Sequence, residues 1–187
     1  MNIKELIAEN ILYPIFGCCY TKNQQPLYNF IESKIPKEFL NKEVYDIGCG
    51  DGSNTVRLKK MFKSKKITGY DHNDHLIKKA KNRGLAIKKI DMNNGLPRGE
   101  LVTFTASLHH VKNKEKTLRK VMRNFDYLFI CEPLLDLYHF LIDAGHPLTK
   151  KDWIKLFDRT LKNYRLYQYK NYIFVFYSRK EKQLPQN

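Results

Sequence analysis

The chain has 187 residues, 42% of them hydrophobic and 28% charged, a length and composition that fit a single globular domain with a sizeable core. No run of about 18 apolar residues indicates a membrane span. The four cysteines show no CxxC spacing, so neither a zinc site nor a disulfide framework is predicted, and reduced thiols in a cytoplasm are the plain interpretation. The net charge of +15 leaves a polyanionic partner such as RNA open.

The first 40 residues are predicted to be helical. Apolar residues at helical spacing indicate one helix over Asn2 to Leu12 and a second over Leu27 to Ile35, which ends before Pro36. The connection between the two helices is rich in aromatic residues, which is unusual for a surface loop.

From Val44 onward, strand and helix patterns alternate, which is typical of a parallel sheet with helices on both faces. Thr149 is expected to cap the last helix, with Asp152 three residues on. Two aromatic runs of period two, at 164–170 and 172–178, predict an antiparallel hairpin. Residues 181–187 are predicted to form a frayed tail. The predicted strands are 44–47, 67–70, 86–90, 101–106 and 127–131, and the predicted helices are 54–63, 73–82, 113–123 and 150–162.

The first of these strands leads into three alternating glycines, Gly48, Gly50 and Gly52, and a helix pattern follows. Such a turn brings backbone N–H groups and a helix N-terminus close to a small ligand. Asp46 and Asp51 flank the glycines, where a dinucleotide would place its pyrophosphate, and like charges repel. A cofactor that is cationic there would be attracted, and S-adenosylmethionine carries both an ammonium and a sulfonium.

Two further strands also lead to acidic residues. The strand after the first helix ends at Asp71, a carboxylate that can hold ribose hydroxyls, and the next strand pattern ends at Asp91. Ser53 stands where a dinucleotide fingerprint needs its third glycine. The glycines and the three acids Asp46, Asp71 and Asp91 together favour S-adenosylmethionine over a dinucleotide.

The stretch Asp46-Ile47-Gly48-Cys49-Gly50-Asp51-Gly52 resembles motif I of the class I (Rossmann-like) S-adenosylmethionine-dependent methyltransferases. The resemblance spans roughly residues 40–180 and implies an α/β three-layer sandwich, with a mostly parallel, seven-stranded Rossmann-like sheet that ends in the C-terminal antiparallel hairpin. It implies one domain over 1–187, with an N-terminal helical cap (1–40), a core (41–180) and the tail. The cofactor-binding residues that it implies are Asp46, Gly48, Cys49, Gly50, Asp71, His72, Asp91, Met92 and Ser107.

Ser107 to Val111 resembles the fourth-strand motif of small-molecule methyltransferases, whose first residues lie beside the methionine part of the cofactor. His110 or His109 can remove a proton from a substrate hydroxyl or amine, since imidazole titrates near neutral pH, and we take His110 as the candidate catalytic residue. The alternative is that one histidine packs while the other bonds backbone or caps a helix. Glu132, near the end of strand five, is expected to anchor a substrate amine or to meet a helix N-terminus.

The resemblance also implies that the N-terminal helices and the segment Leu134 to Pro147 cover the site. Aromatic residues there either line a substrate pocket or pack on the sheet: Tyr13, Phe16, Tyr20, Tyr138 and Phe140. His139, Asp143 and His146 imitate the spacing of metal ligands, but nothing else supports a metal and none is predicted.

The expected function is methyl transfer from S-adenosylmethionine, with S-adenosylhomocysteine as product, to an oxygen, nitrogen or carbon atom of a small molecule in the cytoplasm. Two alternatives stay open. Twelve Lys and Arg residues between 57 and 89 form a basic edge that either contacts the phosphates of tRNA or rRNA or simply solvates helix faces. The second alternative is a protein that binds S-adenosylmethionine without catalysing methyl transfer. The sequence predicts no oligomeric state.

Overall fold

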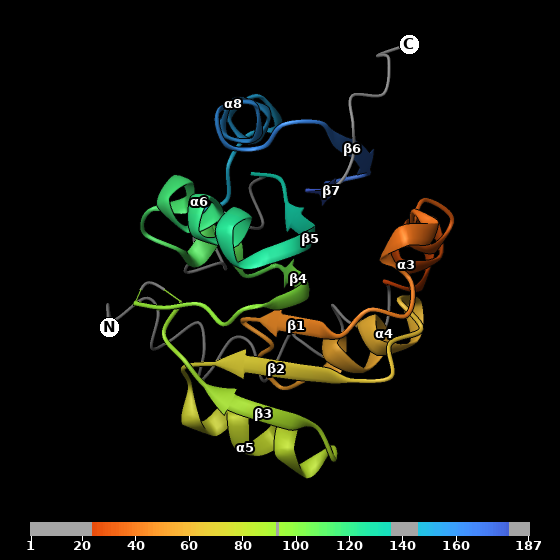
Figure 1. The fold of residues 1–187 in the computed structure, drawn as a ribbon, viewed down its shortest axis with the longest axis vertical. Helices are drawn as coiled ribbons and strands as arrows, with labels where there is room; N and C mark the ends of the chain where they lie inside the picture. The colour runs from red at the N-terminus through yellow and green to blue at the C-terminus, as the bar shows by residue number, and fades with distance from the viewer. Residues whose placement is uncertain (1–23, 93, 136–145, 180–187) are drawn as a thin grey trace.

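A computed structural model describes residues 24–92, 94–135 and 146–179. Its centre is a seven-stranded sheet with the strand order β3-β2-β1-β4-β5-β7-β6 (Figure 1). Strands β1 to β5 pair in parallel, and β7 runs antiparallel to both β5 and β6. The strands are β1 (Val44–Ile47), β2 (Ile67–Asp71), β3 (Ala86–Lys89), β4 (Gly99–Thr105), β5 (Phe125–Pro133), β6 (Tyr164–Tyr169) and β7 (Tyr172–Ser178). The predicted parallel sheet with a C-terminal hairpin is confirmed.

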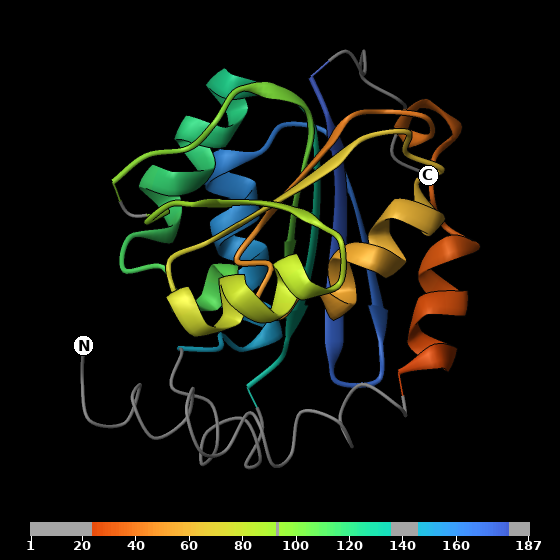
Figure 2. The same cartoon turned by 90° about the horizontal axis from the view of Figure 1, so that it is seen from below.

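Helices cover both faces of this sheet, so the predicted three-layer arrangement is also confirmed (Figure 2). One buried cluster joins α3 and α4 to the sheet, and a second joins α6 and α8 to the opposite face. Helix α5 packs against β2 and β3. The helices are α3 (Gln25–Glu32), α4 (Ser53–Met61), α5 (Asp74–Asn82), α6 (Lys114–Asn124) and α8 (Lys150–Thr160), with short 3-10 turns η2 (Lys37–Phe39) and η3 (Leu108–His110).

The strand order reverses at β1, and this reversal positions the site. Strand β1 pairs with β2 on one side and with β4 on the other, so the chain leaves β1 in one direction and returns to it from the other. Ligands of open α/β sheets bind beyond the carboxyl ends of the strands at such a switch point. The glycine turn that follows β1 lies there.

Several boundaries differ from the predicted ones because long-range pairing decides them. Strand β5 runs to Pro133 because β4 and β7 pair with it on its two sides. The hairpin turn has two residues, Lys170 and Asn171, since Tyr169 already pairs with Tyr172. Lys170 takes a positive φ of 49°, which a tight turn requires.

Some predictions lie outside the described residues: the helix over 2–12, the aromatic residues Tyr13, Phe16, Tyr20, Tyr138 and Phe140, the residues His139 and Asp143, and the tail 181–187. Among the helices that are described, none has both the length and the apolar character needed to cross a bilayer.

The predicted cap of the last helix is present at Thr149. Its hydroxyl oxygen accepts a hydrogen bond from the Asp152 backbone N–H at 3.2 Å, and the hydroxyl donates to the Asp152 carboxylate at 2.6 Å. The cap precedes a helix whose Trp153 and Phe157 are fully buried in the core beside α6. The capping bonds therefore hold the start of α8 on the sheet.

We predict that Thr149→Ala lowers the free energy of unfolding by about 1 kcal/mol, because it leaves a backbone N–H without its capping acceptor. Urea titration measures the loss. The matched control is Thr149→Ser, which keeps the hydroxyl and should stay within a few tenths of a kcal/mol of the parent. Equal losses in both variants would contradict the capping role.

Candidate cofactor site at the strand tips

The glycine turn after β1 needs glycine for two separate reasons. Gly48, Gly50 and Gly52 all have positive φ angles, of 72°, 55° and 81°, a region that residues with a Cβ atom avoid. A Cβ atom on Gly48 would also lie 2.5 Å from the Cβ of Ser107, so the turn touches the loop after β4. The backbone N–H groups of Gly48 and Cys49 both donate to the Tyr70 carbonyl of β2, at 2.7 and 3.1 Å. Three strand tips thus meet at this turn.

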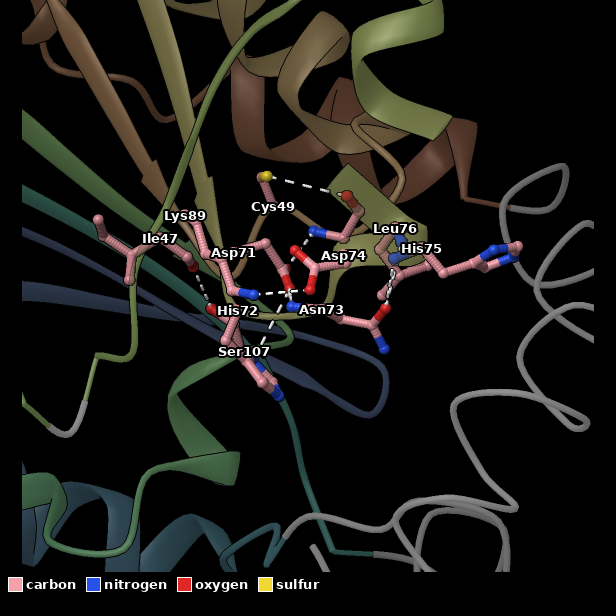
Figure 3. Close-up of polar contacts among 11 residues, drawn as sticks. Ile47, Cys49, Asp71, His72, Asn73, Asp74, His75, Leu76, Lys89 and Ser107 are labelled. Carbon is pink, nitrogen blue, oxygen red and sulfur yellow. Dashed lines mark hydrogen bonds and ion pairs between the residues drawn. The ribbon is translucent and has the colours of Figure 1, made fainter. Parts of the chain in front are cut away.

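Asp71 ties the end of β2 to the glycine turn (Figure 3). One carboxylate oxygen accepts a hydrogen bond from the Gly50 N–H at 2.8 Å, and the other accepts one from the Asn73 N–H at 2.9 Å. The neighbouring His72 is exposed, with its Nδ1 atom 3.8 Å from the carboxylate. Asp71 therefore lies against the turn, His72 lies beside Asp71, and the contact of both residues with a cofactor stays a prediction.

Asp46 lies beneath the same turn and is almost fully buried. Its two oxygens accept hydrogen bonds from the hydroxyls of Thr55, at 2.6 Å, and Thr103, at 2.9 Å. Burial raises the pKa of Asp46 to about 6, the two hydroxyls pull it down, and the nearby charge of Asp71 adds to the rise. Its direct contact with a cofactor stays a prediction. What the structure adds is a negative charge under the turn, held by two threonines that no sequence motif singled out.

The pKa of the Cys49 thiol reflects the negative charges around the turn. Burial raises its pKa, and the carboxylates of Asp46, Asp71 and Asp51 raise it further, because a thiolate would be repelled by them. The turn is therefore a region of negative potential.

Asp51 contributes less to this field than its sequence position indicates. Its carboxylate forms an ion pair with Arg83 at 2.9 Å and accepts hydrogen bonds from the Ser53 N–H and hydroxyl. Although partial burial raises the pKa of Asp51, the bonds from Ser53 and the charge of Arg83 outweigh that effect and lower it. Of the two acids that flank the glycines, Asp51 is thus neutralised by Arg83. The second negative charge near Asp46 comes instead from Asp71, which pairs with no Lys or Arg of the described residues.

The residues after β3 lie on the same edge of the sheet. Asp91 is exposed and accepts a hydrogen bond from the Asn94 side chain at 2.9 Å. The methyl group of Met92 would be 3.4 Å from a Cβ atom on Gly48, so Met92 borders the glycine turn. Both residues were predicted to bind the cofactor, and their contact with it stays a prediction.

The loop after β4 is anchored by a buried carboxylate on β5. The Ser107 hydroxyl donates to the Ile47 carbonyl at 2.7 Å (Figure 3). Glu132 accepts hydrogen bonds from the backbone N–H groups of Ser107 and Leu108, at 3.0 and 2.8 Å, and its second oxygen lies 2.5 Å from Nδ1 of His109. Of the two roles predicted for Glu132, it takes the second, since η3 begins at Leu108.

The two histidines of this loop differ in surroundings. His109 is buried, whereas His110 is exposed, and their rings are in contact at a tilt of 40°, with centroids 4.1 Å apart. His109 therefore takes the packing role that was one of the two predicted alternatives. His110 remains accessible to a substrate, and its catalytic role stays a prediction.

Comparison with known proteins adds the decisive observation. Residues 39–164, more than half of the chain, match the family model described as "Methyltransferase domain". The chain belongs to this family. The methyltransferase domain is 28% identical, over 158 residues, to protein 235L of Invertebrate iridescent virus 6, which carries a provisional methyltransferase name. This alignment covers 74% of the chain and 55% of the viral protein, so the domain spans about half the length of that relative.

Solved structures show the same fold at low sequence identity. An S-adenosylmethionine-dependent methyltransferase from Thermotoga maritima superposes with a TM-score of 0.74 and 12% identity, covering 96% of this methyltransferase domain and 100% of that chain. Human N-acetylserotonin methyltransferase, solved with S-adenosylmethionine, gives a TM-score of 0.67 and 15% identity, covering 91% of this chain and 59% of that one.

We predict that Gly48→Ala destabilises the methyltransferase domain more than Gly84→Ala does. Gly84 has a similar φ of 77° but nothing within 4 Å of its would-be Cβ, so that variant isolates backbone strain, about 1–2 kcal/mol. Gly48→Ala adds the collision with Ser107, about 1–3 kcal/mol more. Urea unfolding measures both variants, and equal losses would contradict the close approach of the turn to the β4 loop.

The raised pKa of Asp46 predicts a pH dependence of stability. The folded state holds a proton on Asp46 up to about pH 6, whereas the ordinary value is 3.8, so the folded state binds more protons between these values. Stability contributed by this group is therefore present at low pH and lost as pH rises through about 6, by about 2–3 kcal/mol. Asp46→Asn should remove this fall, as measured by urea unfolding at pH 4 and 7.5. An identical pH profile in the parent and the variant would refute the assignment.

Proposed function

We propose that this chain is an S-adenosylmethionine-dependent methyltransferase that transfers a methyl group to an oxygen, nitrogen or carbon nucleophile of a small molecule. The observation that carries the proposal is uncompensated negative charge at the glycine turn. Within the described residues, neither Asp46 nor Asp71 forms an ion pair with Lys or Arg, although the chain has a net charge of +15. Such a site suits a cationic cofactor and disfavours a pyrophosphate.

The residues present fit the proposed cofactor. Asp71 can accept hydrogen bonds from ribose hydroxyls, Asp91 can accept one from the adenine amino group, and Met92 offers an apolar surface to the ring. The turn has glycines at three positions of positive φ, so a cofactor bound there would meet backbone without a side chain at those positions. When bound, S-adenosylmethionine supplies a methyl group that its positive sulfur already activates, so the protein mainly has to align the acceptor.

The acceptor is proposed to be deprotonated, where that is needed, by His110. Its ring is exposed on η3, next to the loop that Ser107 joins to β1. An exposed imidazole can take a proton near neutral pH and pass it to water. An acceptor that is nucleophilic without deprotonation would need no such base.

The positions of four lysines of the basic edge support a small acceptor rather than RNA. Helix α4 begins at the glycine turn, so the lysines of its last turn, Lys59 and Lys60, lie at the far end from the site. Lys79 and Lys81 likewise lie in the last turn of α5, which runs back from the tip of β2. Cations in these positions stabilise the helix C-termini. A phosphate footprint there would hold RNA away from the strand tips.

The proposed cofactor is tested by calorimetry and thermal shift with S-adenosylmethionine, S-adenosylhomocysteine and NAD. We expect the first two to bind and to raise the melting temperature, because a ligand that binds only the folded state stabilises it, and NAD to do neither. Binding of NAD alone would contradict the proposal. Binding of S-adenosylmethionine without turnover across broad acceptor pools would favour a non-catalytic binding protein.

We predict that Asp71→Asn weakens S-adenosylmethionine binding by about 1.5–3 kcal/mol, because it removes charge-assisted hydrogen bonds at the strand tip. Calorimetry measures the change. The control is Asp126→Asn. Asp126 pairs with Arg179, which follows the last strand of the hairpin, and the affinity of this variant for S-adenosylmethionine should match that of the parent. An unchanged affinity in Asp71→Asn would refute the ribose assignment.

A further inference from the structure

The buried Glu132–His109 pair is not explained by cofactor or acceptor contacts. Glu132 is fully buried near the end of β5, and His109 is 1% exposed. A carboxylate in such a place is costly unless hydrogen bonds satisfy it. Here three donors do so: two backbone N–H groups at the start of η3 and the imidazole Nδ1.

These bonds connect three strand tips through one carboxylate. Glu132 lies on β5 and holds the backbone of Ser107 and Leu108, which follow β4. The Ser107 hydroxyl in turn holds the Ile47 carbonyl at the end of β1. A Cβ atom on Gly48 would lie only 2.5 Å from the Cβ of Ser107, so the β4 loop and the glycine turn are in close contact.

The pair also bears on which ring nitrogen of His109 carries a hydrogen. One oxygen of Glu132 accepts two backbone N–H groups, and its second oxygen lies within hydrogen-bond distance of Nδ1 of His109, at 2.5 Å. Because a carboxylate can only accept hydrogen bonds, the hydrogen of this bond is assigned to Nδ1. The bond fixes the orientation of the His109 ring, and the His110 ring lies against it at a tilt of 40°.

We propose that Glu132 is a positioning residue for the methyl-transfer site: through the loop backbone and the His109 ring, it fixes the β4 loop against the glycine turn. This inference rests on the function proposed above. It assigns Glu132 no contact with cofactor or acceptor. Its effect reaches the cofactor through Ser107, and it reaches the exposed His110 through the contact between the two histidine rings.

The test variant is Glu132→Gln in the full chain, which keeps the shape and an oxygen for the two backbone N–H groups. Its amide NH₂ then faces Nδ1, so His109 must switch to the tautomer with the hydrogen on Nε2. We expect imidazole ¹⁵N NMR to show Nδ1–H in the parent and Nε2–H in the variant, and calorimetry to show about tenfold weaker S-adenosylmethionine binding. Glu115→Gln, on the exposed face of α6, is the matched control and should change neither.

If Glu132→Gln does not fold, His109→Leu and His109→Asn replace it. Leu removes the donor to Glu132 and should weaken S-adenosylmethionine binding about tenfold, whereas Asn offers an N–H near the Nδ1 position and should recover most of that loss. Equal affinities for Leu and Asn would overturn the inference.

The outcomes separate this inference from the function on which it rests. A parent that binds S-adenosylmethionine, with a Glu132→Gln variant of equal affinity or an unchanged His109 tautomer, overturns the positioning role alone. A parent that does not bind S-adenosylmethionine overturns the proposed function, and the positioning role with it.

Discussion

The constraint on which the site depends is buried negative charge that no Lys or Arg of the described residues pairs with. Asp46 and Asp71 are held by hydroxyls and backbone N–H groups, which satisfy their hydrogen bonding but leave their charge in place. Two nearby acids do form ion pairs with cations: Asp51 pairs with Arg83, and Asp74 pairs with Lys89. In a chain with a net charge of +15, two central carboxylates that have no Lys or Arg partner among the described residues maintain a local field of the opposite sign.

The strand order explains why these groups meet. Because β1 pairs with β2 and β4 on its two sides, the carboxyl ends of three strands and the glycine turn converge at one edge. Neutral donors then lock the edge: Gly50 donates to Asp71, Ser107 to Ile47, and Ser107 and Leu108 to Glu132. Backbone N–H groups and hydroxyls thus hold the turn in place. Because these donors are neutral, they leave the negative potential of the turn unchanged in sign.

Much of this architecture could be predicted from the sequence because it depends on local patterns. The alternation of strand and helix patterns predicted the parallel sheet, the aromatic runs of period two predicted the hairpin, and the glycines predicted a turn after β1. The cap at Thr149 followed from a residue spacing that is set within one helical turn. Strand ends were less accurate, as at β5, because pairing partners distant in the chain decide them.

The partners of the acidic side chains could not be read in the same way. Arg83 neutralises Asp51 across 32 positions, and Thr103 reaches Asp46 across 57, distances over which no periodicity acts. The pairing of His109 with Glu132 likewise depends on β4 and β5 being neighbours in register. The sequence therefore indicated which strand tips carry acids, while the fold determined which of those acids keep their charge.

The most direct test of the central claim is proton release on cofactor binding near pH 6, measured by calorimetry in buffers of different ionisation enthalpy. Asp46 has a pKa of about 6, and a sulfonium bound near it would favour its charged form. The account predicts that S-adenosylmethionine releases protons from Asp46 and that S-adenosylhomocysteine, whose sulfur is neutral, releases fewer. Equal proton release for the two compounds, or none for either, would contradict a site built on negative charge.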